Sequence, residues 1–185
     1  MFEFTLLAIG MATTFAEPAK TYSVGLERPQ SVVSQRQEDY YDWRVSCVET
    51  DGETRCILQQ QLLNMKTNQS ILSLELEMPS HGPGEGTIVM PLGMAVDRDS
   101  SLQIDDAEDL RRLKIETCVP AGCISHFEID ADFMRAMRRA RTLKVQLFSA
   151  TVEGRQVTFP LSLEGFPQAL DRSAALTARI DTDRQ

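Results

Sequence analysis

The stretch Trp43-Arg-Val-Ser-Cys47-Val-Glu-Thr-Asp51-Gly52-Glu-Thr-Arg-Cys56 decides the fold. Its centre, Asp51-Gly52, is a strong signal for a two-residue type I′ turn, in which both central residues take positive φ. Folding the chain there places Cys47 opposite Cys56 in a non-hydrogen-bonded pair of antiparallel strands, where Cα atoms approach to about 4.5 Å. That separation suits a cross-strand disulfide, so the stretch predicts a disulfide-linked β-hairpin.

A second pair of cysteines, Cys118 and Cys123, encloses Val-Pro-Ala-Gly. Pro120 and Gly122 take the second and fourth positions of a type I turn, so this loop also predicts a local disulfide. Structural zinc is the alternative, but zinc favours Cys-x2-4-Cys spacing, and only the second pair meets it. Disulfides at all four cysteines would require an oxidising compartment.

The N-terminus offers a route to such a compartment. Residues 4–16 form an apolar run that ends in Thr14-Phe15-Ala16, the pattern of a secretory signal cleaved after Ala16. The run is too short to span a bilayer comfortably. Glu3 stands where such signals carry Lys or Arg, which leaves a buried N-terminal helix as the alternative. We expect a signal peptide over residues 1–16, no transmembrane span, and a periplasmic or secreted protein.

The charge balance narrows the classes of partner. The 185 residues include 27 acidic and 19 basic side chains, for a net charge of −8. This excess argues against non-specific binding to nucleic acid and against electrostatic attachment to anionic lipid. Only two histidines, His81 and His126, are available for catalysis or metal binding. The sequence specifies no oligomeric state.

One domain of mostly β structure follows the N-terminal region. Residues 17–40 are polar and aperiodic, so we expect a flexible lead-in to a domain over residues 41–170. Alternating apolar residues between turn signals predict strands over 41–48, 55–63, 70–78, 87–92, 101–104, 111–117, 123–129, 143–147 and 157–163.

Two short helices complete the expected fold. Asp130 or Asp132 can cap a helix over residues 133–140, and residues 168–180 predict a second helix within a helical or disordered tail over 171–185. We therefore predict an antiparallel β-sandwich with two short helices and two local disulfides. Trp43 is expected in the core beside the first disulfide, with an exposed ligand platform as the alternative.

One basic cluster stands out in this acidic chain. It consists of Arg135, Arg138, Arg139 and Arg141, and Arg138 and Arg141 can share a helix face with Arg135. The cluster is either a solvated face near a helix C-terminus or a docking patch. As a patch it would receive an acidic protein or an anionic envelope glycan or lipid.

Catalytic chemistry finds little support. His126 follows Ser125 in a predicted strand, where adjacent residues point to opposite faces, so they cannot form a nucleophile–base pair. No recognisable hydrolase, metalloprotease or phosphate-loop motif occurs. The acidic loop with Asp105-Asp106 and Glu108-Asp109 suggests solvated surface, or else weak calcium binding. We expect no enzymatic activity, no cofactor and no metal.

Five elements occur in order along the chain: Trp43-x3-Cys47, Cys56, Met90-Pro-Leu-Gly93, Cys118-x2-Ala-Gly-Cys123, and Phe159-Pro-Leu-Ser-Leu-x-Gly165-Phe166-x2-Ala169-Leu170. Together they resemble the invasion-associated locus B family over residues 41–170. The resemblance implies an exported protein of the periplasm or envelope, as in alphaproteobacteria and their relatives, and it brings no catalytic residues. Most members belong to free-living bacteria, so the family name does not imply virulence.

These observations favour a non-enzymatic exported protein that binds a protein or envelope component. The alternative is a periplasmic enzyme or small-ligand carrier with a site around His126.

Overall fold

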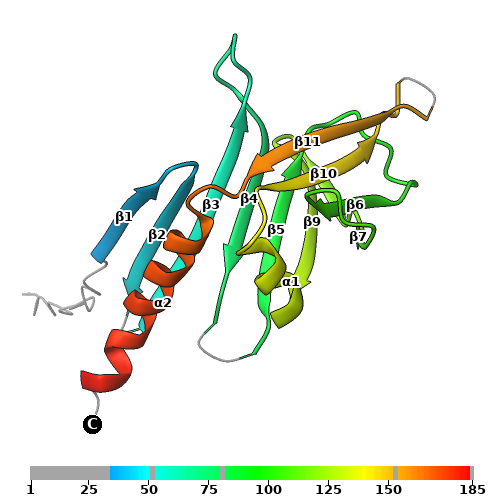
Figure 1. The fold of residues 1–185 in the computed structure, drawn as a ribbon. Coiled ribbons are helices and arrows are strands. Elements are labelled where there is room, and N and C mark those ends of the chain that lie inside the picture. Colours follow the sequence, from blue (N-terminus) through cyan, green and yellow to red (C-terminus); the bar gives the residue numbers. More distant parts are fainter. Residues whose placement is uncertain (1–33, 51–52, 80–81, 152–153, 184–185) are drawn as a thin grey trace, which may run out of the picture. The chain divides into compact units, whose positions relative to one another are not determined.

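The computed structural model describes residues 34–50, 53–79, 82–151 and 154–183. Their strands are β1 (Ser34–Tyr40), β2 (Trp43–Thr50), β3 (Glu53–Leu63), β4 (Ser70–Glu77), β5 (Gly84–Met90), β6 (Ser100–Ile104), β7 (Leu110–Leu113), β8 (Thr117–Val119), β9 (Gly122–Ile129), β10 (Thr142–Phe148) and β11 (Gln156–Ser162). Two helices, α1 (Ala131–Met137) and α2 (Phe166–Asp183), join them (Figure 1). No described helix is both long and apolar enough to cross a membrane.

Two antiparallel sheets confirm the predicted β-sandwich. One sheet has the strand order β1-β2-β3-β4-β5-β9-β8, and the other has the order β11-β10-β6-β7. Helix α2 contacts β1, β2 and β3, while β11 contacts β3 and β7 contacts β9. The layer facing the larger sheet is therefore part helix and part sheet (Figure 1). Alternating apolar side chains fill the space between the layers, among them Trp43, Val45, Leu58, Leu74, Ile88, Leu102, Val145 and Leu161.

Both predicted disulfides are present, and none of the four cysteines is free. Strands β2 and β3 pair in the predicted register, with Cys47 opposite Cys56 and a Cα–Cα distance of 4.1 Å. Cys118 faces Cys123 across the β8–β9 hairpin at a Cα–Cα distance of 3.9 Å. Asp51-Gly52, the predicted turn of the first hairpin, lies outside the described residues.

The structure corrects the predicted start of the domain. Residues 34–40, expected at the end of a flexible lead-in, form β1 and pair with β2 from Ser34–Glu49 to Tyr40–Trp43. The alternating apolar pattern that identifies strands is missing from β1. An edge strand with little buried surface needs few apolar residues, so this strand could not be recognised from its sequence. The predicted signal peptide and residues 17–33 lie outside the described residues.

Two strand predictions also need correction. The expected strand over residues 111–117 divides into β7 and β8, which belong to different sheets, because the chain crosses between the layers after Leu113. The strand expected over residues 87–92 instead begins at Gly84 and ends at Met90. A Cβ on Gly86 would lie 2.2 Å from the Phe127 ring, so this glycine makes room for the aromatic side chain opposite it on β9.

The C-terminal helix belongs to the domain, which extends past the predicted boundary at Leu170. Phe166, Ser173 and Leu176 of α2 are buried. The helix follows Gly165, whose φ is +86° and where a Cβ would lie 2.1 Å from the carbonyl oxygen of Tyr40. Only glycine allows the chain to pass this close to the backbone of β1.

An ion pair fastens β1 to α2. The Glu38 carboxylate accepts hydrogen bonds from Nε and Nη2 of Arg172 at 2.8 and 2.9 Å, and from the Tyr40 hydroxyl at 2.7 Å. These bonds, those of Arg172 foremost, lower the pKa of Glu38 from 4.5 to about 2. A depressed carboxyl pKa stabilises the native state above pH 4.5, and this contribution is lost as the pH falls through 2.

We therefore expect Glu38→Gln to lower the free energy of unfolding by roughly 1–3 kcal/mol at pH 7. The difference from wild type should shrink as the pH falls from 4.5 towards 2. Urea unfolding followed by circular dichroism at several pH values measures it. Glu49→Gln, at an exposed position on β2, is the matched control. A constant difference across this pH range would show that the ionised carboxylate does not carry the effect.

Candidate functional site

Helix α1 is fixed to the domain at its N-terminus. Asp130 is the N-cap, and its Oδ1 accepts a hydrogen bond from the backbone N–H of Phe133 at 2.8 Å. Arg111 of β7 pairs with Asp130, and its guanidinium lies 4.4 Å above the centre of the Phe133 ring. Met137, at the other end of α1, is fully buried. Of the two predicted caps, Asp130 is therefore the correct one.

The segment after α1 is held by the acidic loop. Asp105, at φ +47°, accepts hydrogen bonds from the backbone N–H groups of Arg141 and Thr142 at 3.1 and 2.9 Å. Asp106 pairs with Lys144 of β10 at 2.6 Å. Both carboxylates thus hold the start of β10, a role that was not predicted. The described residues contain no group of three or more His, Cys, Asp or Glu placed to hold a metal ion.

The four arginines of the predicted cluster lie within one short segment and differ in their partners. We call Arg135, Arg138, Arg139 and Arg141 the basic corner. Arg135 pairs with Asp132, and Arg138 donates to both carboxylate oxygens of Asp171 in α2, at 2.8 and 3.2 Å. This hydrogen bonding to Asp171 raises the pKa of Arg138. The side chains of Arg139 and Arg141 are exposed and have no ion-pair partner among the described residues.

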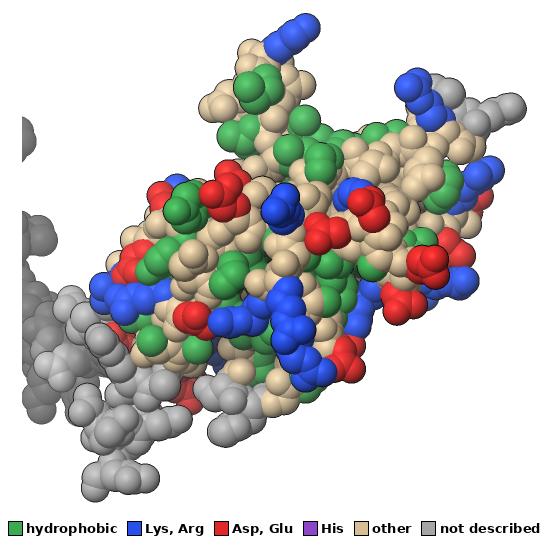
Figure 2. All heavy atoms as spheres, in the orientation of Figure 1, with side chains coloured by type: hydrophobic (Ala, Val, Ile, Leu, Met, Phe, Trp, Pro, Cys, Tyr) green, Lys and Arg blue, Asp and Glu red, His purple; other side chains and the backbone are tan. Residues whose placement is uncertain are grey.

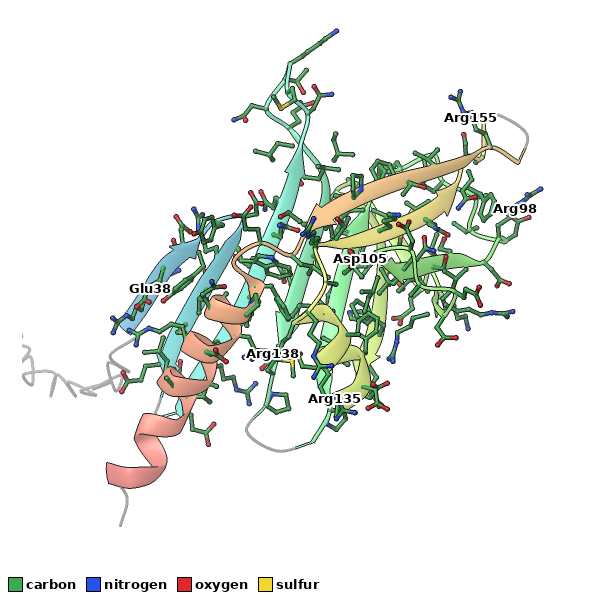
Figure 3. All side chains as sticks on the ribbon, in the orientation of Figure 1. Glu38, Arg98, Asp105, Arg135, Arg138 and Arg155 are labelled. Carbon is green, nitrogen blue, oxygen red and sulfur yellow. A yellow bond between two sulfur atoms is a disulfide. The ribbon has the colours of Figure 1, made fainter. Side chains whose placement is uncertain are left out.

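Figure 2 shows a band of Lys and Arg side chains in the region of α1, with acidic side chains beside it. Figure 3 places Arg135 at α1 and Arg138 between α1 and α2, on the side of α1 that faces α2. Arg138 therefore joins two elements of the fold. Arg139 and Arg141 are the members of the basic corner without an ion-pair partner among the described residues.

His126 lies on the outer face of the larger sheet. Its Nδ1 is 2.9 Å from Oε2 of Glu116, and this hydrogen bond lowers the pKa of Glu116. Ser125 is fully buried on the inner face, as strand alternation predicts. An open hollow of 360 Å³ beside His126 is lined by Glu85 and Glu128 among others. The arrangement offers a histidine and carboxylates, but the neighbouring serine faces away from them.

Two surface features were missed from the sequence. Glu77, Glu85 and Glu128 stand directly opposite one another on β4, β5 and β9, which forms a row of carboxylates on the outer face. The second is the hairpin of residues 61–72, which extends beyond its neighbouring strands. Alternation predicts that Glu77 faces outward, but only the pairing register reveals its neighbours.

Comparison with known proteins identifies similar chains. A family model described as Invasion associated locus B (IalB) protein matches residues 43–174. An Invasion protein B homolog of Brucella abortus strain 2308 is 34% identical over 170 residues, which cover 92% of this chain and 96% of that protein. Invasion protein B of Bartonella bacilliformis is 30% identical over 140 residues, 75% of each chain.

A solved structure shares this fold. The crystal structure of invasion associated protein b from Bartonella henselae superposes with a TM-score of 0.71 at 28% sequence identity. The match covers 76% of this chain and 96% of that one. The same architecture therefore occurs in a relative of known structure.

Proposed function

Since the chain belongs to the Invasion associated locus B (IalB) family, we propose that it is an exported envelope protein without catalytic activity, whose basic corner binds an anionic partner. The partner is an acidic protein or an envelope component with clustered negative charge. The protein resides in the periplasm or is secreted.

Export is supported by the two disulfides and by the leader-like sequence over residues 1–16. Disulfides persist in the periplasm and outside the cell, whereas cytosolic reductants keep thiols reduced. Both bridges close hairpins that pair in register, so they are part of the fold. A chain built in this way suits an oxidising compartment.

The observation that carries the binding proposal is the state of Arg139 and Arg141. Both side chains are exposed and unpaired among the described residues, although the chain has an excess of eight negative charges. The segment that bears them is held at one end by the α1 cap and at the other by Asp105. Arginines on a fixed backbone lose little further backbone freedom when they bind, and their planar guanidinium groups suit carboxylate or phosphate oxygens.

The surroundings of His126 support the proposed lack of catalytic activity. This side chain has Glu116 as its partner, and Ser125, beside it in sequence, is buried on the opposite face. A histidine next to a carboxylate needs a nucleophile or an activated water to start hydrolysis. The similar proteins of Brucella abortus and Bartonella bacilliformis carry names that refer to invasion and not to a catalysed reaction.

The test is charge reversal at the two unpaired arginines. We expect Arg139→Glu with Arg141→Glu to weaken partner capture by about tenfold, because each reversal replaces an attraction with a repulsion. The variant and wild type are cross-linked in the envelope fraction of the native host. In parallel, sedimentation with phosphatidylglycerol vesicles tests whether the anion is a lipid. Intact mass of the same samples should show a chain that starts at Glu17 with four thiols blocked until reduction.

The matched control is Arg55→Glu with Arg155→Glu, which makes the same charge change at two other exposed arginines without an ion pair among the described residues. It should leave capture unchanged. Arg138 is spared because its reversal would break the contact with Asp171. Equal loss in both double variants would mean that net charge governs capture and that the basic corner is not the interface. Undiminished capture in the Arg139/Arg141 variant would also exclude it.

A further inference from the structure

The hairpin of residues 61–72, which we call the arm, carries free sheet edges. Pairing of β3 with β2 ends at Gln59–Arg44, and pairing of β4 with β5 begins only at Ser73–Val89. Strands β3 and β4 continue to pair with each other beyond both points. Figure 1 shows the resulting two-stranded ribbon projecting past its neighbours. Along β3, residues 61–63 therefore have one backbone edge without a partner strand among the described residues.

The tip of the arm is ordered by its own hydrogen bonds. Asn64 donates its backbone N–H to the Gln69 carbonyl at 2.8 Å, and its side-chain Oδ1 accepts from the N–H groups of Lys66 and Thr67 at 2.9 and 3.2 Å. Met65, held on this turn, is 99% exposed. Figure 2 shows hydrophobic side chains along the projection and a basic one at its end. A preformed projection with an apolar tip loses little freedom on binding.

The edge of the arm lacks the protection that the other sheet edges have. Charged residues, prolines and very short strands discourage unwanted pairing at an edge. The four outermost strands carry such features: Arg36, Glu38 and Asp39 on β1, Arg111 and Arg112 on β7, three residues followed by Pro120 on β8, and Pro160 on β11. By contrast, Gln61, Leu62 and Leu63 carry neither charge nor proline. The arm is therefore the edge most open to another strand.

A hollow at the base of the arm complements its tip. Its volume is 250 Å³, and it is lined by Asp39, Tyr41 and Asp42 beside Gln60 and Gln61 of β3. Lys66 is the only charged residue between Arg55 and Glu75, so the arm carries a single positive charge. In the hollow, Arg44 donates to both carboxylate oxygens of Asp39, at 2.7 and 3.2 Å, which leaves Asp42 as the lining carboxylate without an ion-pair partner among the described residues. Tyr41, at 74% exposure, adds an apolar surface for Met65. The tip and the hollow match in charge and in apolar character.

We propose that two copies of this chain pair through their arms, with residues 61–63 of each forming an antiparallel ladder about a two-fold axis. A two-fold axis makes identical segments run antiparallel, so one copy supplies both halves of the contact. In that pairing the tip of each arm points past its partner's β3 edge towards the β1–β2 turn, where the hollow lies. Lys66 of one copy then meets Asp42 of the other, twice in each dimer.

The experiment is sedimentation equilibrium of the disulfide-bonded full chain. The interface is small, so we expect a concentration-dependent dimer with a dissociation constant of about 10–100 μM. Lys66→Glu should raise this constant by about tenfold, because both symmetry-related contacts change. Asp42→Lys should raise it as well. Mixing the two variants should restore dimers, because the mixed pair has both charges exchanged at one contact and keeps the native Lys66–Asp42 pair at the other.

Two further variants separate the ladder from the charges. Gln61→Pro removes a backbone donor at the free edge and should abolish the dimer. Leu63→Lys should do the same, while Val48→Lys, at a position of similar exposure (38% against 40%) on β2, should not. Circular dichroism confirms that each variant is folded. A chain that stays monomeric up to about 1 mM would overturn the proposal. Monomers whose arm cross-links to a different envelope protein would overturn it too, and would assign the arm to that protein.

Discussion

Replacing Trp43 with alanine is expected to lower the free energy of unfolding by about 4 kcal/mol. The indole is 1% exposed, and its ring centre lies 4.9 Å from that of Phe166 at the start of α2. Its Nε1–H donates to the Ser162 carbonyl oxygen at 3.0 Å. The side chain thus joins β2, the end of β11 and α2, so its removal leaves a cavity where the two sheets and the helix meet.

Urea unfolding monitored by circular dichroism tests this expectation. Trp43→Phe should have a smaller effect, about 2 kcal/mol, because it keeps an aromatic ring but loses the hydrogen bond to Ser162. Tyr41→Ala, two residues away and 74% exposed, is the control and should change stability by less than about 0.5 kcal/mol. Similar losses for Trp43→Ala and Tyr41→Ala would mean that the indole does not hold the layers together.

Removing the first disulfide by Cys47→Ala with Cys56→Ala is expected to cost about 3 kcal/mol of stability. The bridge spans nine positions and limits the freedom of the unfolded chain. Both cysteines are also 4% exposed in the core, so the lost sulfur atoms leave unfilled space. The double alanine variant at Cys118 and Cys123 should lose less, about 2 kcal/mol, because it opens a loop of five positions and Cys118 is exposed.

The same urea titration with and without reductant measures both effects. Reduction of wild type should lower the midpoint at least as far as either double variant, and it should not affect a variant that lacks all four cysteines. Intact mass before and after alkylation verifies the thiol state of each sample. If the β8–β9 bridge proved more stabilising than the β2–β3 bridge, the arguments from loop length and burial would both be wrong.

The features that could be predicted from the sequence are mostly local. The register of β2 with β3 follows from Asp51-Gly52, because a two-residue turn leaves one way to pair the flanking residues. The hairpin of β10 and β11 likewise follows from two alternating runs separated by a turn. Phe166 and Leu170 also fill the core as their apolar character suggests.

Features that depend on distant contacts could not be predicted in this way. Strand β1 has a polar sequence, and its anchor is Arg172, 134 positions away. The chain passes from one sheet to the other between β7 and β8. This follows from the pairing of β6 with β10 and of β9 with β5, which are contacts between distant parts of the sequence. Within the basic corner, no residue near Arg138 in the sequence indicates that its side chain pairs with Asp171. Because of that pairing, Arg138, which was expected to dock a partner, instead links α1 to α2.

The closure of the domain by α2 has a consequence for the order in which the protein can mature. A growing chain emerges from its N-terminus, so β1 to β3 appear first and α2, their cover, appears last. The two hairpins can pair and oxidise early, because their contacts are short in sequence. Trp43 can pack against Phe166 only after the chain has grown by a further 123 residues. Until then the apolar face of the first three strands is not covered by α2. A chain in which both hairpins have paired and α2 has not yet docked would therefore expose the apolar face of β1 to β3 to other molecules.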